Sequence, residues 1–511
     1  MTRSGANQNA DARNDAPSGT SLISLVGLIA GPLVALGIYL ITPDSMEAPA
    51  RATAAVGSLM AIWWMTEAIP LPATSLLPIA LFPILGVLPI KETTAPYAHK
   101  FIFLFMGGFM LALAMQRWGL HKRIALRTLL LFGTSERRIV AGFMAATATL
   151  SMWVSNTATT VMMLPIAMSV LALASENSDD EEETGYDRSP LGLCLLLGVA
   201  YAASIGGVAT IIGTPPNVFL VGYMRDSLGI EVSFLQWMRI GLPLSVVFVV
   251  IAWAMLTYVL HPVSSASIKG GKGLIRDELR ALGKPSRGER VVFIVFMCTA
   301  LAWITRQPLS DWAPVAKLFP AINRLDDSGI AIIAALALFI IPIKPREGVF
   351  TLDWQTARKL PWGVLLLFGG GLSLAAAVQT SGLDAWIGDR AVVLSGAPTL
   401  LIIVAITALV IFLTEVTSNT ATAATFLPIL GGAAVGLGIE PLQLVIPAAL
   451  AASCAFMMPV ATPPNAIVFG SGKINIQDML RTGFWLNLIG IVLITGCAYT
   501  TVAWALGGLT P

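Results

Sequence analysis

The chain has 511 residues, of which 56% are hydrophobic and only 12% are charged, and its formal net charge is +2. A soluble domain carries about 25% charged residues, so this chain, with a mean hydropathy of +0.79, cannot cover itself with a water-facing surface. The small net charge argues against nucleic acid as a partner. The composition therefore predicts an all-α polytopic protein embedded in a lipid bilayer.

The chain begins with a polar segment, 1–20, whose low complexity predicts a disordered tail. The apolar stretch 21–42 is long enough to cross a bilayer, so we expect a membrane span there rather than a cleaved signal peptide. Further apolar segments follow at 52–68, 71–90, 100–116, 138–174, 189–224, 239–260, 291–306, 328–343, 361–379, 398–437, 440–470 and 483–507. Several of these suit one span of about 20 residues.

Two of these segments, 138–174 and 398–437, are too long for one helix, too short for two spans, and interrupted by polar residues. The interruptions are the same triplet, Ser155-Asn156-Thr157 and Ser418-Asn419-Thr420, at an offset of 263 residues. Polar groups in hydrocarbon need partners, and unwound backbone is tolerated there only inside protein or against a water-filled cavity. A helical hairpin that enters the membrane and turns at the triplet satisfies both conditions.

The triplets also suit the binding of an anion. Ser, Asn and Thr are preferred helix N-caps, and a helix N-terminus presents free N–H groups to a negative charge. Ordinary hydrogen bonding between packed helices is the alternative reading. It explains one triplet, but it does not explain two triplets in register with Leu-Pro pairs at 164–165 and 427–428.

A second repeated motif, Thr-Pro-Pro-Asn, occupies 214–217 and 462–465, at an offset of 248 residues. Two consecutive prolines cannot lie within a continuous helix, so each copy predicts an unwound point in a broken helix. Gly213 and Ala461 precede the copies, and such small residues leave a backbone carbonyl free to face an ion. Carbonyl and hydroxyl oxygens suit Na⁺, so we expect two cation sites flanking one anion site.

The two offsets differ by 15 residues because the first half contains an acidic segment, 175–188, that the second half lacks. Seven Asp and Glu residues make this segment a solvated insert between two spans. Counted as a calcium-binding loop from Asp180, it has Leu191 at the twelfth position, where a bidentate Glu is needed, so a metal site is not expected there.

Charge predicts the orientation of the two halves. Six Lys or Arg residues lie between Gln116 and the first triplet, whereas the equivalent stretch of the second half, 380–401, has only Arg390. By the positive-inside rule the first hairpin is approached from the cytoplasm and the second from outside, which predicts inverted repeats and a cytoplasmic N-terminus. The segment 261–290, with seven Lys or Arg, is expected to be a cytoplasmic basic loop.

These motifs, together with Trp-Trp-Met-Thr-Glu-Ala-Ile-Pro at 63–70, make the chain resemble the divalent anion:sodium symporter family from about Ala52 to the C-terminus. That family includes carriers of succinate, malate, fumarate and citrate. The resemblance implies a homodimer of about eleven spans per protomer, with a scaffold domain and a transport domain that moves as an elevator. It also implies a bacterial inner-membrane location.

The resemblance assigns roles to the motif residues. Substrate carboxylates are expected at Asn156, Thr157, Thr214, Pro215, Asn419, Thr420, Thr462 and Pro463. One sodium site is expected at Ser151, Ser155, Asn156 and Gly213. Its symmetry mate is expected at Thr414, Thr417, Asn419 and Ala461.

We expect the chain to be divided into six parts. They are the tail 1–20, scaffold helices 21–116, a first transport half 117–260, the basic loop 261–290, scaffold helices 291–379 and a second transport half 380–511. Two acidic residues in apolar segments, Glu67 and Glu415, are interpreted as structural, with a functional role as the alternative. An ionised carboxylate at Glu415 would repel a dicarboxylate but attract Na⁺.

We therefore expect a sodium-coupled importer of C4-dicarboxylates or related di- and tricarboxylates, with Na⁺ as coupling ion and no cofactor. A sodium-independent dicarboxylate exchanger of the same fold is the nearest alternative, and an anion channel is a more distant one. No nucleophile–base pair, phosphate-binding loop or metal-ligand spacing supports an enzyme.

Overall fold

The computed structural model describes residues 22–505 except 44, 177–188, 266–269 and 319. Nine helices within these residues are long and apolar enough to cross a membrane, which confirms the expected polytopic α-helical protein. They are Leu22–Ile41, Ile90–Arg117, Asn156–Ser175, Pro190–Gly207, Phe234–Leu260, Arg287–Asp311, Trp362–Thr380, Asn419–Leu437 and Ile476–Thr500. Shorter apolar helices accompany them, and the described part also contains one strand pair, β1 (Pro342–Lys344) and β2 (Val349–Phe350).

The first two helices pack closely because α1 carries small residues where it meets its neighbour. Helix α1 (Leu22–Ile41) lies along α2 (Ala48–Thr66). A Cβ atom at Gly27 would lie 2.0 Å from Thr66 Oγ1, and one at Gly31 would lie 2.6 Å from Trp63 Nε1. Two glycines four residues apart on one face let helices approach in this way in membranes.

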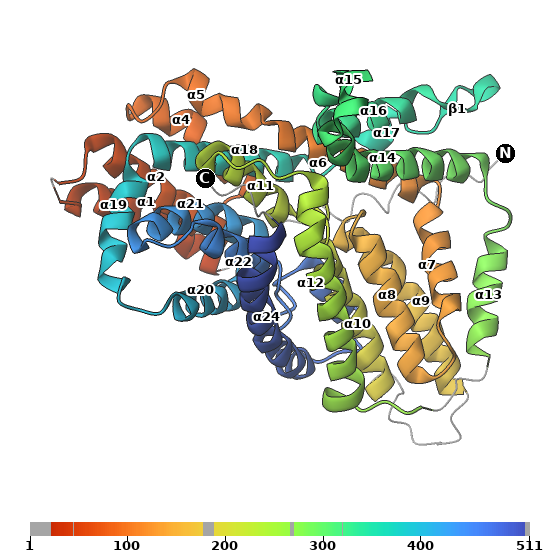
Figure 1. Cartoon of the computed structure of the whole chain (residues 1–511). Helices are drawn as coiled ribbons and strands as arrows, with labels where there is room; N and C mark the ends of the chain where they lie inside the picture. The colour runs from red at the N-terminus through yellow and green to blue at the C-terminus, as the bar shows by residue number, and fades with distance from the viewer. Residues whose placement is uncertain (1–21, 44, 177–188, 266–269, 319, 506–511) are drawn as a thin grey trace, which may run out of the picture.

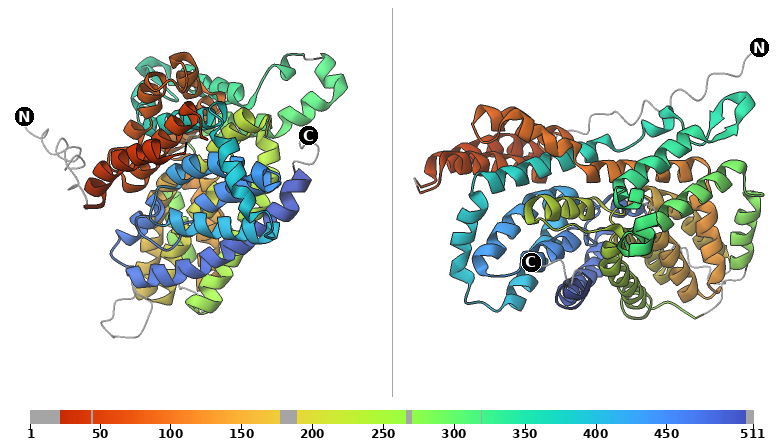
Figure 2. Two further views of the ribbon diagram at one scale, coloured as in Figure 1. Left: turned by 90° about the vertical axis from the view of Figure 1, so that its left-hand side faces the viewer. Right: turned by 45° about the horizontal axis from the view of Figure 1, so that its top comes forward.

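A layer of helices extends across one side of the molecule (Figures 1 and 2). It comprises α3 (Leu71–Thr74), α4 (Leu77–Ile84), α5 (Ile90–Thr94), α6 (Lys100–Arg117), α14 (Arg287–Asp311), α15 (Ala313–Leu318), α16 (Asp327–Ile340), α17 (Trp354–Ala357) and α18 (Trp362–Thr380). Within the layer α16 packs against both α6 and α14. Two series of helices lie beneath this layer as Figure 1 is drawn.

The helices beneath the layer form two series with the same order of parts. The first is α7 (Leu120–Leu131), α8 (Glu136–Ser151), α9 (Asn156–Glu176), α10 (Pro190–Gly207), α11 (Pro215–Leu228) and α12 (Phe234–Ala254) with a π-helical extension (Met255–Leu260). The second is α19 (Leu383–Ala391), α20 (Thr399–Thr414), α21 (Asn419–Leu437), α22 (Leu442–Ala452), α23 (Pro463–Phe469) and α24 (Ile476–Ala505). The leading helices α7 and α19 lie at opposite ends of the molecule (Figure 1).

Each series contains the two breaks that the sequence predicts. The chain turns over four residues between α8 and α9 and again between α20 and α21, where the triplets lie. It is also non-helical between α10 and α11 and between α22 and α23, each time up to the first proline of Thr-Pro-Pro-Asn. These unwound points bring backbone carbonyls and N–H groups into the middle of the protein.

Helix α10 forms the centre of the core. Every residue from Leu191 to Gly207 is buried, as expected for a helix that is apolar on all sides. It contacts α8 so closely that a Cβ atom at Gly206 would lie 2.5 Å from the carbonyl oxygen of Ala148. This packing holds the first hairpin against the first broken helix.

The structure corrects one prediction. The segment 261–290 is not a loop throughout, because it contains the amphipathic helix α13 (Gly271–Ala281) and the first turn of α14. A capping box starts α14: Ser286 Oγ accepts a hydrogen bond from Glu289 N, and Glu289 Oε2 accepts one from Ser286 N. The predicted tail 1–20 lies outside the described residues, as do all but the first two residues of the acidic insert 175–188.

Candidate binding site

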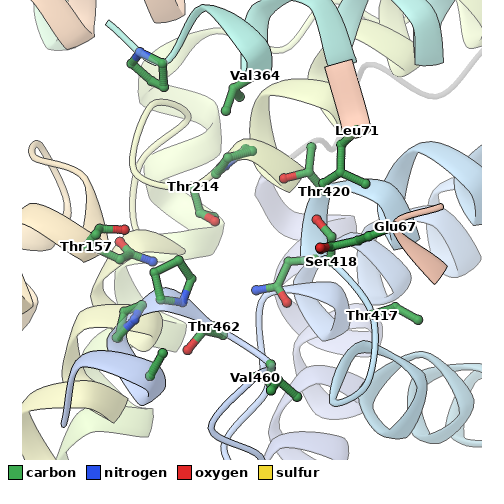
Figure 3. Close-up of a pocket in the computed structure, with 18 of the residues that line it drawn as sticks. Glu67, Leu71, Thr157, Thr214, Val364, Thr417, Ser418, Thr420, Val460 and Thr462 are labelled. Atoms are coloured by element: carbon green, nitrogen blue, oxygen red, sulfur yellow. The ribbon is translucent and has the colours of Figure 1, made fainter. Parts of the chain in front are cut away.

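A cavity of about 850 Å³ lies between the two hairpin tips and the two broken helices. Both triplets contribute to its wall, and so do both Thr-Pro pairs (Figure 3). Helices of the neighbouring layer close another side with residues such as Phe105, Leu71 and Val364. The cavity therefore combines polar groups from two repeated motifs with an apolar wall from outside the repeat.

The first tip is held by a buried hydroxyl. Ser151 Oγ lies 2.5 Å from Asn156 Oδ1 and 2.7 Å from the carbonyl oxygen of Ala203 in α10. The hydroxyl carries a single proton, so three oxygens share one hydrogen here. Ser155 Oγ accepts a hydrogen bond from Ala158 N and caps the start of α9. The result is a dense group of oxygens immediately behind the cavity wall.

The second tip repeats this arrangement. Thr414 Oγ1 lies 2.8 Å from Asn419 Oδ1 and 3.1 Å from the carbonyl oxygen of Ala452 in α22. Thr417 adds a contact of 2.7 Å to the Thr422 hydroxyl. Both asparagine side chains are therefore oriented in the same way, by a hydroxyl five residues earlier in the chain.

The asparagine of each Thr-Pro-Pro-Asn motif holds its unwound segment in place. Asn217 Nδ2 donates to the carbonyl oxygens of Gly207, Val208 and Thr210 at 3.2, 3.2 and 2.8 Å. Asn465 Nδ2 donates to those of Ala455 and Met458 at 3.1 and 3.0 Å. Each side chain is fully buried, so these bonds fix the carbonyls that precede the two prolines.

The first unwound segment also depends on two glycines. A Cβ atom at Gly213 would lie 2.3 Å from the carbonyl oxygen of Gly207, and one at Gly207 would lie 2.8 Å from Asn156 Oδ1. Side chains at these positions would separate the hairpin tip from the broken helix. The glycines therefore allow the oxygens of the two elements to come together.

Twelve of the fourteen predicted ligand residues line this one cavity. They are Ser155, Asn156, Thr157, Gly213, Thr214, Pro215, Thr417, Asn419, Thr420, Ala461, Thr462 and Pro463. Ser151 and Thr414 do not line it, because they are buried behind the wall and contact it through Asn156 and Asn419. The ligand roles of the fourteen residues stay predictions, but their common location is a feature of the fold.

The cavity wall is nearly free of formal charge. Among its lining residues in the described part of the chain, Glu67 is the one ionisable side chain, and no Lys, Arg or His is present. Helices α9 and α21 begin at the wall, and a helix N-terminus carries a partial positive charge. An anion in this cavity would therefore meet hydroxyls, amides and helix ends rather than cationic side chains.

The sequence predicts neither the apolar wall of the cavity nor the position of Glu67 in it. Glu67 follows α2 in a left-handed conformation with a φ of 48°, and its side chain is exposed to the cavity. The sequence favours a structural role for Glu67 and does not place it in a cavity. The signal in the sequence that points to this position is the carboxylate of Glu67 within an apolar segment.

Glu415 does not line the cavity, and its contacts agree with the structural interpretation. Its carboxylate accepts hydrogen bonds from the backbone N–H groups of Phe456, Met457 and Met458 at 2.7–3.0 Å. Asn487 Nδ2 from α24 donates a further bond at 2.7 Å. This buried carboxylate connects the second tip to the unwound segment of α22–α23.

Comparisons with known proteins find relatives that match nearly the whole chain. Residues 21–506 match the family described as the sodium:sulfate symporter transmembrane region. The sodium-dependent dicarboxylate transporter of Staphylococcus saprophyticus is 45% identical over 487 residues, which cover 94% of this chain and 92% of that protein. The transporter of the same description from Staphylococcus aureus strain USA300 is 44% identical over 489 residues, with the same coverage. The crystal structure of the Alcanivorax borkumensis YdaH transporter has a similar fold, with a TM-score of 0.57 at 15% identity, over 91% of this chain and 100% of that one.

Proposed function

The chain belongs to the sodium:sulfate symporter family, and from that premise we propose that it imports C4-dicarboxylates such as succinate, malate and fumarate, or related di- and tricarboxylates, together with Na⁺. The observation that carries the proposal is the single cavity lined by both triplets and both Thr-Pro pairs. The relatives described as sodium-dependent dicarboxylate transporters support the choice of cargo and coupling ion.

The oxygen groups behind the two tips support the assignment of the cation sites. Na⁺ takes carbonyl and hydroxyl oxygens at unwound points of transporter helices. Such oxygens are contributed by Ser151, Asn156 and Gly213 in one half and by Thr414, Asn419 and Ala461 in the other. In the proposed sites these oxygens coordinate Na⁺, and the bound ions bring positive charge to a cavity wall that has no cationic side chain among the described residues.

The anion would bind between the two cations, held by the asparagine and threonine side chains of the triplets. Because the cavity wall has no cationic side chain in the described residues, the dicarboxylate depends on bound Na⁺ for its attraction. A ligand that binds well only when another ligand is present is coupled to it by differential affinity. This dependence is the physical basis that we propose for symport.

We also propose an elevator mechanism for alternating access. The scaffold would comprise 21–116 and 291–379, and the transport domain would comprise 117–260 and 380–511. The separate helix layer supports this division, and the opposite positions of α7 and α19 support inverted repeats (Figure 1). In this proposal the hairpins are re-entrant, the protomer has about eleven spans, the protein forms a homodimer, and it lies in a bacterial inner membrane with its N-terminus in the cytoplasm.

Uptake of labelled succinate into proteoliposomes tests the proposal. Asn156→Ala and Asn419→Ala should each abolish sodium-driven uptake, whereas the matched variant Asn323→Ala, an exposed asparagine outside the cavity, should transport normally. Full activity of either cavity variant would remove that asparagine from the site. Uptake that requires a preloaded anion rather than a sodium gradient would favour an exchanger, and failure to accumulate succinate against its gradient would favour a channel.

A further inference from the structure

A second cavity, of about 290 Å³, lies where α7 meets the start of α14, away from the cavity between the hairpin tips. Three arginines line it: Arg123 and Arg127 from α7, and Arg290 from the first turn of α14. The wall also includes Glu289, Phe293 and Ile294 of α14. Neither the proposed transport cycle nor the repeated motifs use these residues.

One of the three arginines is already neutralised. Arg123 Nε and Nη2 donate to the two carboxylate oxygens of Glu289 at 2.7 and 3.2 Å, and its other contacts are the carbonyl oxygens of Gly283 and Leu282. Both side chains of this pair are buried. Glu289 is therefore committed to Arg123 and to the capping box, and its charge is used within the protein.

The other two arginines keep their hydrogen-bonding capacity. Arg127 and Arg290 are exposed, and the guanidinium group of neither makes a hydrogen bond or an ion pair within the described part of the chain. Each guanidinium has five N–H donors in a planar fork that matches a phosphate group. The cavity therefore presents the two guanidinium groups of Arg127 and Arg290 beside the buried Arg123–Glu289 ion pair. The net positive charge of these four side chains suits a monoanionic or dianionic phosphate.

The cavity opens onto an apolar surface that belongs in lipid. Phe293 and Ile294 are 46% and 59% exposed, and Met297 and Leu301, one and two turns further along, are 38% and 53% exposed. Residues at such spacings share one face of a helix. Because α14 is long and apolar enough to span the membrane, this face starts at the arginines and continues toward the membrane interior.

We propose that the arginine cavity between α7 and α14 binds the phosphate headgroup of an anionic phospholipid, and that an acyl chain of this lipid lies along the exposed face from Phe293 to Leu301. Basic pockets at the ends of spanning helices bind anionic headgroups in this way. A free phosphate ion would satisfy the arginines but would leave the apolar face without a partner. The bound lipid would connect α7 to α14, and so would connect the helix leading into the first hairpin to the neighbouring layer.

The full-length protein, purified in detergent, allows a direct test. Thermal unfolding is measured with added phosphatidylglycerol, phosphatidylcholine or inorganic phosphate, and retained lipids are measured by native mass spectrometry. We expect phosphatidylglycerol alone to raise the melting temperature and to remain bound. The variant Arg127→Gln/Arg290→Gln should bind it roughly tenfold to thirtyfold more weakly. The control Arg346→Gln/Arg358→Gln, which removes two exposed arginines elsewhere, should bind it like the unaltered protein.

Three results would overturn the proposal. The first is that the cavity variant and the control bind phosphatidylglycerol equally well. The second is that phosphatidylcholine stabilises the unaltered protein as much as phosphatidylglycerol does. The third is that inorganic phosphate stabilises it as much as phosphatidylglycerol does, which would mean that the site binds free anions rather than a lipid. The last two comparisons need no variant, so they decide the matter even if the double substitution prevents folding.

Discussion

The indole rings of Trp153 and Trp303 lie almost parallel, with 6.4 Å between their centroids and 4° between their planes. Trp153 belongs to the first hairpin tip, two residues before Ser155, and Trp303 belongs to α14 of the neighbouring layer. Phe234, at the start of α12, stacks on both rings at 5.9 and 4.6 Å. The tip that carries the first triplet is thus fixed against aromatic side chains outside its own hairpin.

Replacing the indole of the tip should disturb the first sodium site. Trp153→Ala removes the stacking contacts, which contribute about 0.5–1.5 kcal/mol for each aromatic pair beyond the buried area. We expect the sodium concentration for half-maximal succinate uptake to rise about fivefold, because the tip no longer holds Asn156 firmly. Trp153→Phe, which keeps an aromatic ring, should lie close to the unaltered protein. An unchanged sodium dependence of Trp153→Ala would show that the stack does not position the site.

The two buried hydroxyls behind the tips should matter for sodium rather than for folding. Ser151→Ala and Thr414→Val each remove the group that contacts an asparagine Oδ1, and one hydrogen bond contributes about 0.5–1.5 kcal/mol. We expect each variant to need threefold to tenfold more sodium for half-maximal uptake. Thr414→Ser keeps the hydroxyl and serves as the control. If Thr414→Ser is as impaired as Thr414→Val, the methyl group rather than the hydroxyl is responsible.

Much of the polar side of the site was predictable because its signals are local. A triplet repeated at a fixed offset and two adjacent prolines in an apolar chain are visible without any knowledge of contacts. Asn217 and Asn465 belong to the same motif, yet their role in fixing the unwound carbonyls could not be predicted. That role depends on the path of the backbone seven to ten residues earlier.

The apolar side of the site was not predictable for a different reason. In a chain that is 56% hydrophobic, Phe105 and Val364 resemble any lipid-facing residue, and only long-range packing brings them to the cavity. The sequence does not predict helix α13, because a short amphipathic helix rich in Lys and Arg resembles a basic loop. Its apolar residues Leu274 and Ile275 pack against the core and supply the stability that its local sequence does not indicate.

Loss of the Glu415 carboxylate should unfold the second half of the site. Glu415→Ala leaves three backbone N–H groups, the buried one of Phe456 and the partly buried ones of Met457 and Met458, without their acceptor. Each unsatisfied donor costs about 1–3 kcal/mol. We therefore expect a markedly lower melting temperature in fluorescence-detected size exclusion, with a smaller decrease for Asn487→Ala, which removes one bond. A Glu415→Ala protein that melts normally and transports would contradict this account.

The remaining prediction concerns Glu67, which brings an ionisable side chain to an otherwise uncharged cavity wall and has a left-handed backbone conformation. It is the one non-glycine residue with a positive φ in the described part of the chain. It is also the one ionisable residue in the cavity wall among the described residues, and its carboxylate makes no hydrogen bond or ion pair with them. Figure 3 shows its side chain extending toward Ser418 of the second triplet. A strained backbone that holds a charged group against a binding cavity is a feature associated with function.

Two substitutions separate the charge of Glu67 from its conformation. Glu67→Gln removes the charge and keeps the strained backbone, whereas Glu67→Gly removes both, because glycine adopts positive φ without the cost of about 1 kcal/mol that a Cβ atom brings. A carboxylate repels a dicarboxylate across the cavity, so both variants should show a KM for succinate about threefold to tenfold lower. Only Glu67→Gly should melt at a higher temperature. A KM that rises in Glu67→Gln would instead mean that the charge attracts Na⁺ more than it repels the substrate, and the half-saturating sodium concentration should then rise with it.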